Sequence, residues 1–572
     1  MSSAAFASRG LTRLLSCAFA ALLGGALYLN ALHNPFVYDD ARTVVDNGSI
    51  VSLRDVASIV LFDSTRPLTN FSFAVDRAIW GEAPFGFHLT SVLLHVLNVM
   101  LVFLITSRIW RDTRESQSQA SDANDTLVAT GAAVLFAVHP LMSEAVVYIS
   151  SRSDLLCAAF SMLAFLAAQR WLRRGGALPF VLVWVLCFAA LLAKETAAVL
   201  PLVVLAYSAL CRPLASTRPR ATTTLTGPLL VAMLIAAAVR LSIFAGIEGG
   251  HLDGGWHGVV AAGITFWDYV RLLCVPVGQT IFHPVATVSS AGDLRVWGSV
   301  ALLVATGAVG WQQRTRRGVA VFGVAWCAVL LAPAVLFSAV DPAGTLAEHR
   351  AYLPAAGFFV SVSALLGETM PLVRRYRSTS LLAPLAFSAV VLMLGTRTYM
   401  RNLVWADPVN LWQEAASYAP SHWLPFEVLG ESLHAGGRHA EAVDAYRTSM
   451  TLRPDNESGA VNLVVCLSEL GRAAEANAAV DALEVIHPAS AYIPIGRGTI
   501  AAIDGRAQPA RLQFLEAIAR DPGNVMARQW LAVLASETDD RAEMLRRCGE
   551  LQRLAPGRLS IARCVELGQP FQ

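Results

Sequence analysis

Two adjacent carboxylates, Asp39 and Asp40, follow the first apolar segment of the chain by only a few residues. Ionised carboxylates are costly to remove from water, and neighbouring carboxylates raise one another's pKa. A pair of this kind beside a membrane can accept a proton from a substrate. The alternative interpretation is a solvated loop that starts after a helix.

Polar residues also gather where a later apolar segment is interrupted. Pro140 breaks a helix between His139 and Glu144, and Arg152 and Asp154 follow at the start of the next apolar run. Acids at a membrane boundary indicate a functional site by default. We therefore expect this second acidic cluster to lie on the same side of the membrane as the aspartate pair.

Single cations lie in or between four other apolar segments. Lys194 joins two of them together with Glu195, and this pair is either the tip of a hairpin or a phosphate ligand. Arg240 lies late in a segment, where an arginine is either functional or extends to the interface. Arg271 has the same two interpretations.

A further polar motif begins with Glu348 and contains Arg350 and Tyr352. We interpret Arg350 as an anion ligand rather than a stop-transfer charge, because orientation does not require a cation on that side. His88 and His95 are interpreted as packing or hydrogen-bonding residues, because no third ligand accompanies them at metal spacing. The sequence has no Walker or Rossmann glycine loop, so a cytoplasmic nucleotide is not evidently used.

The composition is that of a multi-pass membrane protein. The 572 residues are 55% hydrophobic and only 15% charged, which is too apolar for a soluble protein of this size. Because 44 basic and 42 acidic side chains nearly cancel, no global field attracts nucleic acid. Of the nine cysteines, Cys548 and Cys564 could form a disulfide if that end of the chain faces an oxidising compartment.

The apolar segments predict eleven membrane spans. The first follows Arg9 and Arg13 but has no small-residue cleavage site, so we predict a retained span rather than a signal peptide. The stretch 258–275 would invert the sidedness of everything after it, and we predict that it is re-entrant or interfacial. The eleven predicted spans are 11–33, 88–107, 126–143, 153–171, 178–193, 196–210, 223–246, 296–312, 319–338, 353–371 and 380–396.

Every second loop is rich in arginine, as the positive-inside rule requires. The clusters lie at 9–13, 108–114, 170–174, 212–220, 314–317 and 374–377. This pattern predicts a cytoplasmic N-terminus. It places on the opposite side the two aspartates, the Glu144 loop, Lys194, the 247–295 loop, Glu348 and the C-terminal third.

The C-terminal third has an internal repeat. Prolines recur at a constant spacing, at Pro420, Pro454, Pro488, Pro522 and Pro556. This spacing equals the length of a tetratricopeptide repeat, about 34 residues. Stacked helix pairs of this type bury a continuous apolar stripe and leave a concave face for a peptide or protein ligand. We predict a membrane domain at 1–400, a linker helix at 401–422 and about four repeats at 423–572.

The motifs together resemble the transmembrane, tetratricopeptide-repeat-containing O-mannosyltransferase family. The resemblance runs from about residue 20 to the end, and the short array and short loops are closer to a bacterial relative than to the animal members. The motifs that carry it are Phe36-Val-Tyr-Asp-Asp40, Arg66-Pro-Leu-Thr69, Trp80-Gly, Pro84-Phe-Gly-Phe-His88, His139-Pro, Glu144, Ser151-Arg-Ser-Asp154, Lys194-Glu-Thr196, Glu348-His-Arg-Ala-Tyr-Leu-Pro354 and Arg401-Asn-Leu-Val-Trp405.

The resemblance implies an all-α protein with a GT-C glycosyltransferase membrane domain followed by a tetratricopeptide solenoid. It implies a polyprenyl- or dolichyl-phosphate sugar donor, mannose-like, and a protein or glycan acceptor. The location implied is the bacterial inner membrane with periplasmic repeats, or the endoplasmic reticulum membrane with lumenal repeats in a eukaryote. By position, Asp39 or Asp40 is the catalytic base.

A single inverting displacement needs one base and stabilisation of the departing phosphate. The other site residues are expected to bind substrate. We assign sugar or acceptor to Glu144 and Asp154, phosphate to Lys194, Arg240, Arg271 and Arg350, and include Arg152, His139, Glu195, Glu348 and Tyr352 in the site. A divalent metal could bridge carboxylates and phosphate, but no residue pattern requires one.

Two other function classes compete with glycosyl transfer. The membrane part could be an inactive anchor for a repeat scaffold in an envelope or secretory-pathway complex, but an anchor would not need the acids and cations described above. A transporter of lipid-linked sugar would instead place ionisable residues at mid-membrane depth along several spans. Most of them here lie at span ends.

Overall fold

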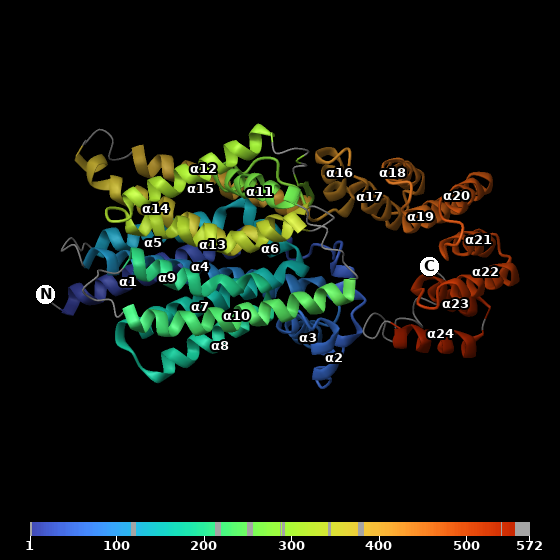
Figure 1. The fold of residues 1–572 in the computed structure, drawn as a ribbon, viewed down its shortest axis with the longest axis horizontal. Helices are drawn as coiled ribbons and strands as arrows, with labels where there is room; N and C mark the ends of the chain where they lie inside the picture. Colours follow the sequence, from blue (N-terminus) through green and yellow to red (C-terminus); the bar gives the residue numbers. More distant parts are fainter. Residues whose placement is uncertain are drawn as a thin grey trace.

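The computed structural model is an elongated molecule with a helical bundle at one end and a helical solenoid at the other (Figure 1). The structure describes residues 3–115, 122–211, 219–248, 256–285, 288, 292–340, 345–375, 382–538 and 540–554. We call the end of the bundle from which the solenoid projects the repeat end. The chain begins at the opposite end.

The bundle is built of apolar helices, most of them long. Two short helices, α2 (Val56–Phe62) and α3 (Pro67–Trp80), lie at the repeat end. The other helices are α1 (Ser3–Leu27), α4 (Pro84–Glu115), α5 (Asp122–Val138), α6 (Ser143–Val147), α7 (Arg152–Arg174), α8 (Ala177–Ala193), α9 (Leu200–Leu210), α10 (Pro219–Glu248), α11 (Trp256–Cys274), α12 (Leu294–Gln313), α13 (Gly318–Val340), α14 (Tyr352–Arg375) and α15 (Leu382–Val404).

Within the described residues, these helices coincide with the eleven predicted spans. Eight are long and apolar enough to cross a membrane, and α5 with the Pro140–Val147 segment forms a ninth, bent by 57°. Two shorter apolar helices, Ala177–Ala193 and Glu195–Leu210, occupy the remaining two positions. The bend follows from Pro140, which lacks the N–H that would continue the helix.

Helix α11 coincides with the predicted re-entrant segment. Ala261, near its start, packs against Val288 and Val296, and Tyr269, near its end, donates a hydrogen bond to the Ala347 carbonyl. Val296 lies at the start of α12, and Ala347 lies just before the start of α14. One helix, α13, lies between α12 and α14 in the chain and runs back along the bundle, so the starts of α12 and α14 are at the same end. Both parts of α11 therefore contact the same end of the bundle, which favours a re-entrant or interfacial helix.

The solenoid consists of antiparallel helix pairs. Gly437, Gly471 and Gly505 lie one repeat length apart at the turn within three successive pairs, with φ of 71°, 69° and 72°, a conformation that glycine adopts without strain. The predicted tetratricopeptide architecture is thus present. Its helices are α17 (Trp423–Ala435), α18 (His439–Leu452), α19 (Glu457–Glu469), α20 (Ala473–Ile486), α21 (Tyr492–Ile503), α22 (Ala507–Arg520), α23 (Val525–Glu537) and α24 (Arg541–Leu554).

A linker helix, α16 (Pro408–Tyr418), joins the bundle to the solenoid. Phe282 of the bundle packs in one cluster with Trp412 of α16 and Val428 of α17. The ring of Tyr38 also lies 5.1 Å from that of Trp412. The first repeat is therefore anchored beside the loop that carries the aspartate pair. Cys548 in α24 is disulfide-bonded, and Cys564 lies outside the described residues.

Helices α13 and α14 cross with their backbones in contact. A Cβ added to Gly323 would lie 2.4 Å from the Gly357 carbonyl oxygen, and one added to Gly357 would lie 2.6 Å from the Gly323 carbonyl oxygen. Small residues permit this close approach, which drives helix association in a membrane through van der Waals contact.

Gly323→Val is expected to destabilise the bundle, because the side chain cannot enter the α13–α14 contact without separating the helices. Overpacking of this kind costs about 1–3 kcal/mol. The measurement is the unfolding temperature in detergent. Gly307→Val is the matched control, since a Cβ at Gly307 in α12 would meet nothing within 4 Å. Equal unfolding temperatures for the two variants would contradict the close contact.

Candidate active site

A cavity of about 620 Å³ opens at the repeat end of the bundle. Its lining has a polar wall and an apolar wall, and α10 and α13 form the apolar one. The polar wall includes Asp39, Arg42, Asp63, Arg66, Lys194, Glu195, His349 and Arg350. The apolar wall includes Leu234, Ala237, Pro333, Ala334, Leu336 and Phe337. A ligand that fits both walls must be amphiphilic.

The two aspartates have different environments. Asp40 is fully buried, and its Oδ1 accepts hydrogen bonds from the Ser150 backbone N–H at 2.8 Å and the Ser150 hydroxyl at 2.6 Å. Its Oδ2 accepts one from the Val37 N–H at 3.1 Å. Burial raises the pKa of Asp40 to about 7. Asp39 is partly exposed and lines the cavity, so only Asp39 can reach a ligand there.

The aspartate loop has an unusual backbone. Tyr38 has φ of 50°, and among the described residues it is the one non-glycine residue with positive φ. Strain of this kind persists only where the surroundings fix it, and it concentrates at functional sites. The buried anchors on both sides of Tyr38, Val37 and Asp40, hold it there and direct Asp39 toward the cavity.

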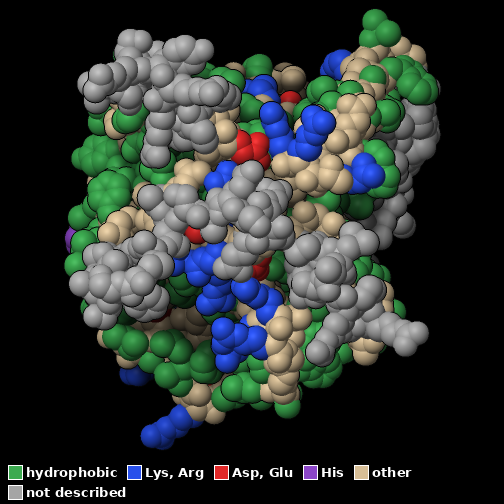
Figure 2. Space-filling model, turned by 90° about the vertical axis from the view of Figure 1, so that its left-hand side faces the viewer, with side chains coloured by type: hydrophobic (Ala, Val, Ile, Leu, Met, Phe, Trp, Pro, Cys, Tyr) green, Lys and Arg blue, Asp and Glu red, His purple; other side chains and the backbone are tan. Residues whose placement is uncertain are grey.

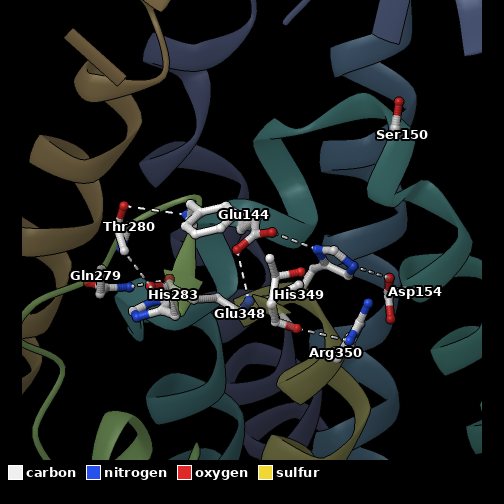
Figure 3. Close-up of polar contacts among 12 residues, drawn as sticks. Glu144, Ser150, Asp154, Gln279, Thr280, His283, Glu348, His349 and Arg350 are labelled. Carbon is white, nitrogen blue, oxygen red and sulfur yellow. Dashed lines mark hydrogen bonds and ion pairs between the residues drawn. The ribbon is translucent and has the colours of Figure 1, made fainter. Parts of the chain in front are cut away.

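A chain of ionisable side chains crosses the floor of the site. The His349 ring lies between two carboxylates, with Nδ1 2.6 Å from Glu144 Oε1 and Nε2 3.9 Å from Asp154 Oδ2 (Figure 3). Lys194 Nζ donates to the same Asp154 oxygen at 2.6 Å. The sequence indicates no role for His349. The one signal for it is its position between the predicted residues Glu348 and Arg350.

Glu348 is buried and holds a loop rather than facing the cavity. Its carboxylate accepts hydrogen bonds from the Gln279 side chain at 3.0 Å and the Thr280 N–H at 3.0 Å, and lies 2.8 Å from His283 Nε2 (Figure 3). Its own N–H donates to Glu144 at 2.9 Å. Next to it, β1 (His283–Pro284) and β2 (Thr345–Leu346) pair as antiparallel strands.

Cations from four segments of the chain line the polar wall, namely Arg42, Arg66, Lys194 and Arg350. Arg66 pairs with Glu195 at 3.4 Å. Arg350 donates to the Thr345 carbonyl at 3.3 Å and lies over the Phe337 ring, 4.9 Å from its centroid. The sequence indicates no role for Arg42 or Arg66. Arg66 is detectable as the first residue of its motif, whereas Arg42 has no comparable signal.

Arg152 lies away from the cavity. It is fully buried, pairs with Asp76 at 2.6 Å and stacks over the ring of Phe73. The guanidinium also donates to the Phe87 carbonyl at 2.7 Å. It therefore joins α7 to α3 and α4 and supports the site from outside.

Three further predicted residues do not line the cavity. Tyr352 is buried, and its hydroxyl lies 2.7 Å from His95 Nδ1. His139 caps the turn after Pro140, where its Nδ1 accepts from the Leu141 N–H at 3.3 Å. Arg271 is exposed and donates to the Val277 carbonyl.

The side chain of one predicted phosphate ligand, Arg240 in α10, lies outside the described residues.

No family model matches the chain. The protein is 35% identical over 210 residues to the protein O-mannosyl-transferase Tmtc1 of Drosophila melanogaster, covering 34% of this chain and 22% of that protein. It is 23% identical over 460 residues to the protein O-mannosyl-transferase F38B6.6 of Caenorhabditis elegans, covering 75% of this chain and 61% of that one. The chain thus spans less than two thirds of the length of these relatives.

Among solved structures, a thermophilic TPR protein of Thermus thermophilus aligns with a TM-score of 0.25 at 20% identity, covering 32% of this chain and 97% of that one. The fly and nematode likenesses agree with the family that the motifs indicated. The chain is a homologue of proteins named protein O-mannosyl-transferases.

Proposed function

We propose that the protein transfers a mannose-like sugar from a polyprenyl- or dolichyl-phosphate donor to a hydroxyl group of a protein or other acceptor. The observation that carries the proposal is a single cavity in which a carboxylate, several cations and an apolar wall meet. The names of the relatives support mannosyl transfer to a protein.

The donor is an amphiphile, and the two walls of the cavity suit its two parts. Lys194, Arg66 and Arg350 lie where they can neutralise a phosphate, and the fixed donors of arginine suit its oxygens. The residues of α10 and α13 would contact the isoprenoid chain. The cations act most strongly on the departing lipid phosphate, since negative charge develops there during transfer.

The acceptor would approach from the solenoid. Tyr38, next to Asp39, contacts Trp412 in the linker helix. An acceptor segment bound by the first repeats would therefore lie close to the cavity as soon as it binds. Holding the acceptor and the donor together lowers the entropic part of the barrier. In this scheme the repeats recruit a peptide or protein and the bundle performs the chemistry.

In the proposed step, Asp39 takes the proton of the acceptor hydroxyl while its oxygen attacks the anomeric carbon and the bond to the lipid phosphate breaks. Asp40 holds the loop in place. Glu144 and Asp154 are proposed to orient the sugar or acceptor through His349 and Lys194. Measuring transfer in the presence of a chelator tests whether a divalent metal would contribute to neutralising the phosphate.

The proposed location places the cavity on the non-cytoplasmic face. Arginine side chains gather on the end of the bundle opposite the solenoid (Figure 2), as expected of a cytoplasmic end. The disulfide at Cys548 supports an oxidising compartment around the repeats. A bacterial periplasm and the endoplasmic reticulum lumen both meet this requirement. The arginines at the end of the bundle opposite the solenoid are Arg108, Arg111, Arg114, Arg170, Arg173, Arg174, Arg314, Arg316 and Arg317.

Asp39→Asn is expected to lower kcat by about 10²–10⁴-fold, the usual contribution of a general base, without changing the unfolding temperature. Transfer from a labelled lipid-phosphate sugar into an acceptor measures this. Asp39→Glu, which keeps a base in place, should recover part of the rate. Full activity of Asp39→Asn would refute the assignment of the base.

The raised pKa of Asp40 predicts a pH dependence of stability. The folded protein binds the Asp40 proton more tightly than the unfolded chain, so this stabilisation is complete below about pH 4 and is lost as the pH rises through about 7. Asp40→Asn has no such proton, and its unfolding temperature should decline less across this range. Parallel pH profiles for the wild type and the variant would contradict the burial of an ionisable Asp40.

Arg66→Gln and Arg350→Gln are each expected to raise KM for the lipid donor by about 10–100-fold, which corresponds to one lost hydrogen bond to a charged group. KM for the acceptor should change little. The control is Arg271→Gln, because Arg271 is exposed and does not line the cavity. An equal rise in KM for all three variants would show that the loss of any positive charge raises KM, and would contradict a specific phosphate contact.

A further inference from the structure

Four potential metal ligands meet in the solenoid, far along the chain from the cavity residues. They are His434 at the end of α17, His439 at the start of α18, and Cys466 and Glu469 in the last turn of α19. One donor atom from each lies within 4.8 Å of all the others. Among the described residues, this is the one group of three or more His, Cys, Asp or Glu side chains that could hold a metal ion.

The four side chains converge on a common point. His434 Nε2 lies 2.8 Å from Glu469 Oε2, and His439 Nδ1 lies 2.9 Å from the same oxygen. The His439 Nδ1 is buried, yet at that distance it forms no hydrogen bond with any described residue. Cys466 Sγ is fully buried at the base of the group. One carboxylate oxygen is thus shared by two imidazoles, with a thiol within 4.8 Å of these atoms.

Stacking of the repeats does not require these residue types. The positions one repeat length further along the chain are occupied by Ser468, Ala473, Ile500 and Ile503, none of which is a metal ligand of the same kind. Helix packing at the equivalent places is therefore satisfied by small or aliphatic side chains. All four positions carry coordinating groups only at the junction of the first and second repeats, which indicates a separate physical reason for them.

The donor set has a clear preference. Two imidazole nitrogens, one thiolate and one carboxylate are ligands of zinc, and four protein ligands close a tetrahedral shell with no open position. Oxygen-preferring cations such as Mg²⁺ and Ca²⁺ do not favour a shell with a thiolate and two imidazoles. In a tetrahedron with bonds of about 2.0–2.3 Å, ligand atoms lie about 3.3–3.8 Å apart. The four donor atoms lie within 4.8 Å of one another, and the two imidazole nitrogens are 2.8 and 2.9 Å from the carboxylate oxygen, which brackets that spacing.

We propose that His434, His439, Cys466 and Glu469 bind one zinc ion as a structural site in the solenoid. On binding, the Cys466 thiol releases its proton to solvent and the sulfur becomes a thiolate ligand, while both imidazoles bind as neutral rings. The ion links the end of α17, the start of α18 and the end of α19. It therefore fixes the first helix pair to the second, directly beyond the helix that packs on Phe282 and Trp412.

The experiment uses the full-length protein in detergent, purified with a histidine-free tag and stripped of metal with a chelator. Zinc is added back and measured by elemental analysis after dialysis. Cobalt(II) is used in parallel, since a thiolate-bound tetrahedral cobalt ion has visible ligand-field bands and a near-ultraviolet charge-transfer band. We expect about one ion per chain and a higher unfolding temperature with zinc than without it.

The test variants take residues that the repeat array already accommodates: His434→Ser, His439→Ala and Cys466→Ser, as found at Ser468, Ala473 and Ser432. Each is expected to weaken zinc binding by at least about 100-fold. Cys466→Ser should also abolish the charge-transfer band. The stability of the zinc-free variants should match that of the zinc-free wild type, so folding remains measurable.

The controls are His487→Ala, a histidine of the solenoid outside the cluster, and Cys187→Ala, a buried thiol in α8. Both should bind zinc like the wild type. Absence of zinc from the refilled wild type would overturn the proposal, as would binding that the three ligand variants leave unchanged. Zinc binding is read without sugar transfer, so the result is independent of the proposed enzymatic function.

Discussion

The burial of one carboxylate, that of Glu348, organises the junction between the two halves of the molecule. A carboxylate removed from water is stable only when its oxygens are fully hydrogen-bonded. Gln279, Thr280 and His283 supply these contacts, so the loop that carries them must fold against the start of α14. The same loop presents Phe282 to the linker helix and the first repeat. The position of the solenoid therefore depends on the hydrogen bonds that stabilise the buried Glu348 carboxylate.

The Glu348 backbone also connects this junction to the cavity. Its N–H binds Glu144, and Glu144 in turn lies beside His349, which faces Asp154 and Lys194. Side chains in such a network fix one another's rotamers, because each buried polar atom needs its partner. The floor of the cavity and the anchor of the repeats are thus parts of one polar network.

Periodic features were predictable from the sequence, and pairwise features were not. Apolar length located the spans, and the regular spacing of prolines located the repeats, because both patterns depend on local geometry alone. The aspartate pair was found by its position, but only the hydrogen bonds from Ser150 and Val37 distinguish Asp40 from Asp39. Ser150 is 110 residues away in the sequence. No local pattern contains that information.

Arg152 is a second example. A charged residue at the start of a span can face a site or a neighbouring helix, and the partner of Arg152, Asp76, lies in α3, far away in the sequence. Arg66 and His349, which line the cavity, belong to the sequence motifs. Nothing in their spacing distinguishes them from the other residues of those motifs. Contacts between distant segments decide these roles.

The close crossing of α13 and α14 limits how the cavity could widen for a bulky ligand. Gly323 and Gly357 bring the two backbones into contact, so these helices cannot slide or separate without losing that contact. Phe337 of α13 and His349, in the turn just before α14, both line the cavity. The remaining apolar wall is α10, which packs mainly on α8, α9 and the 195–199 turn and exposes Val231 and Ile235 outward. A widening of the cavity that keeps the α13–α14 crossing intact would therefore have to displace α10.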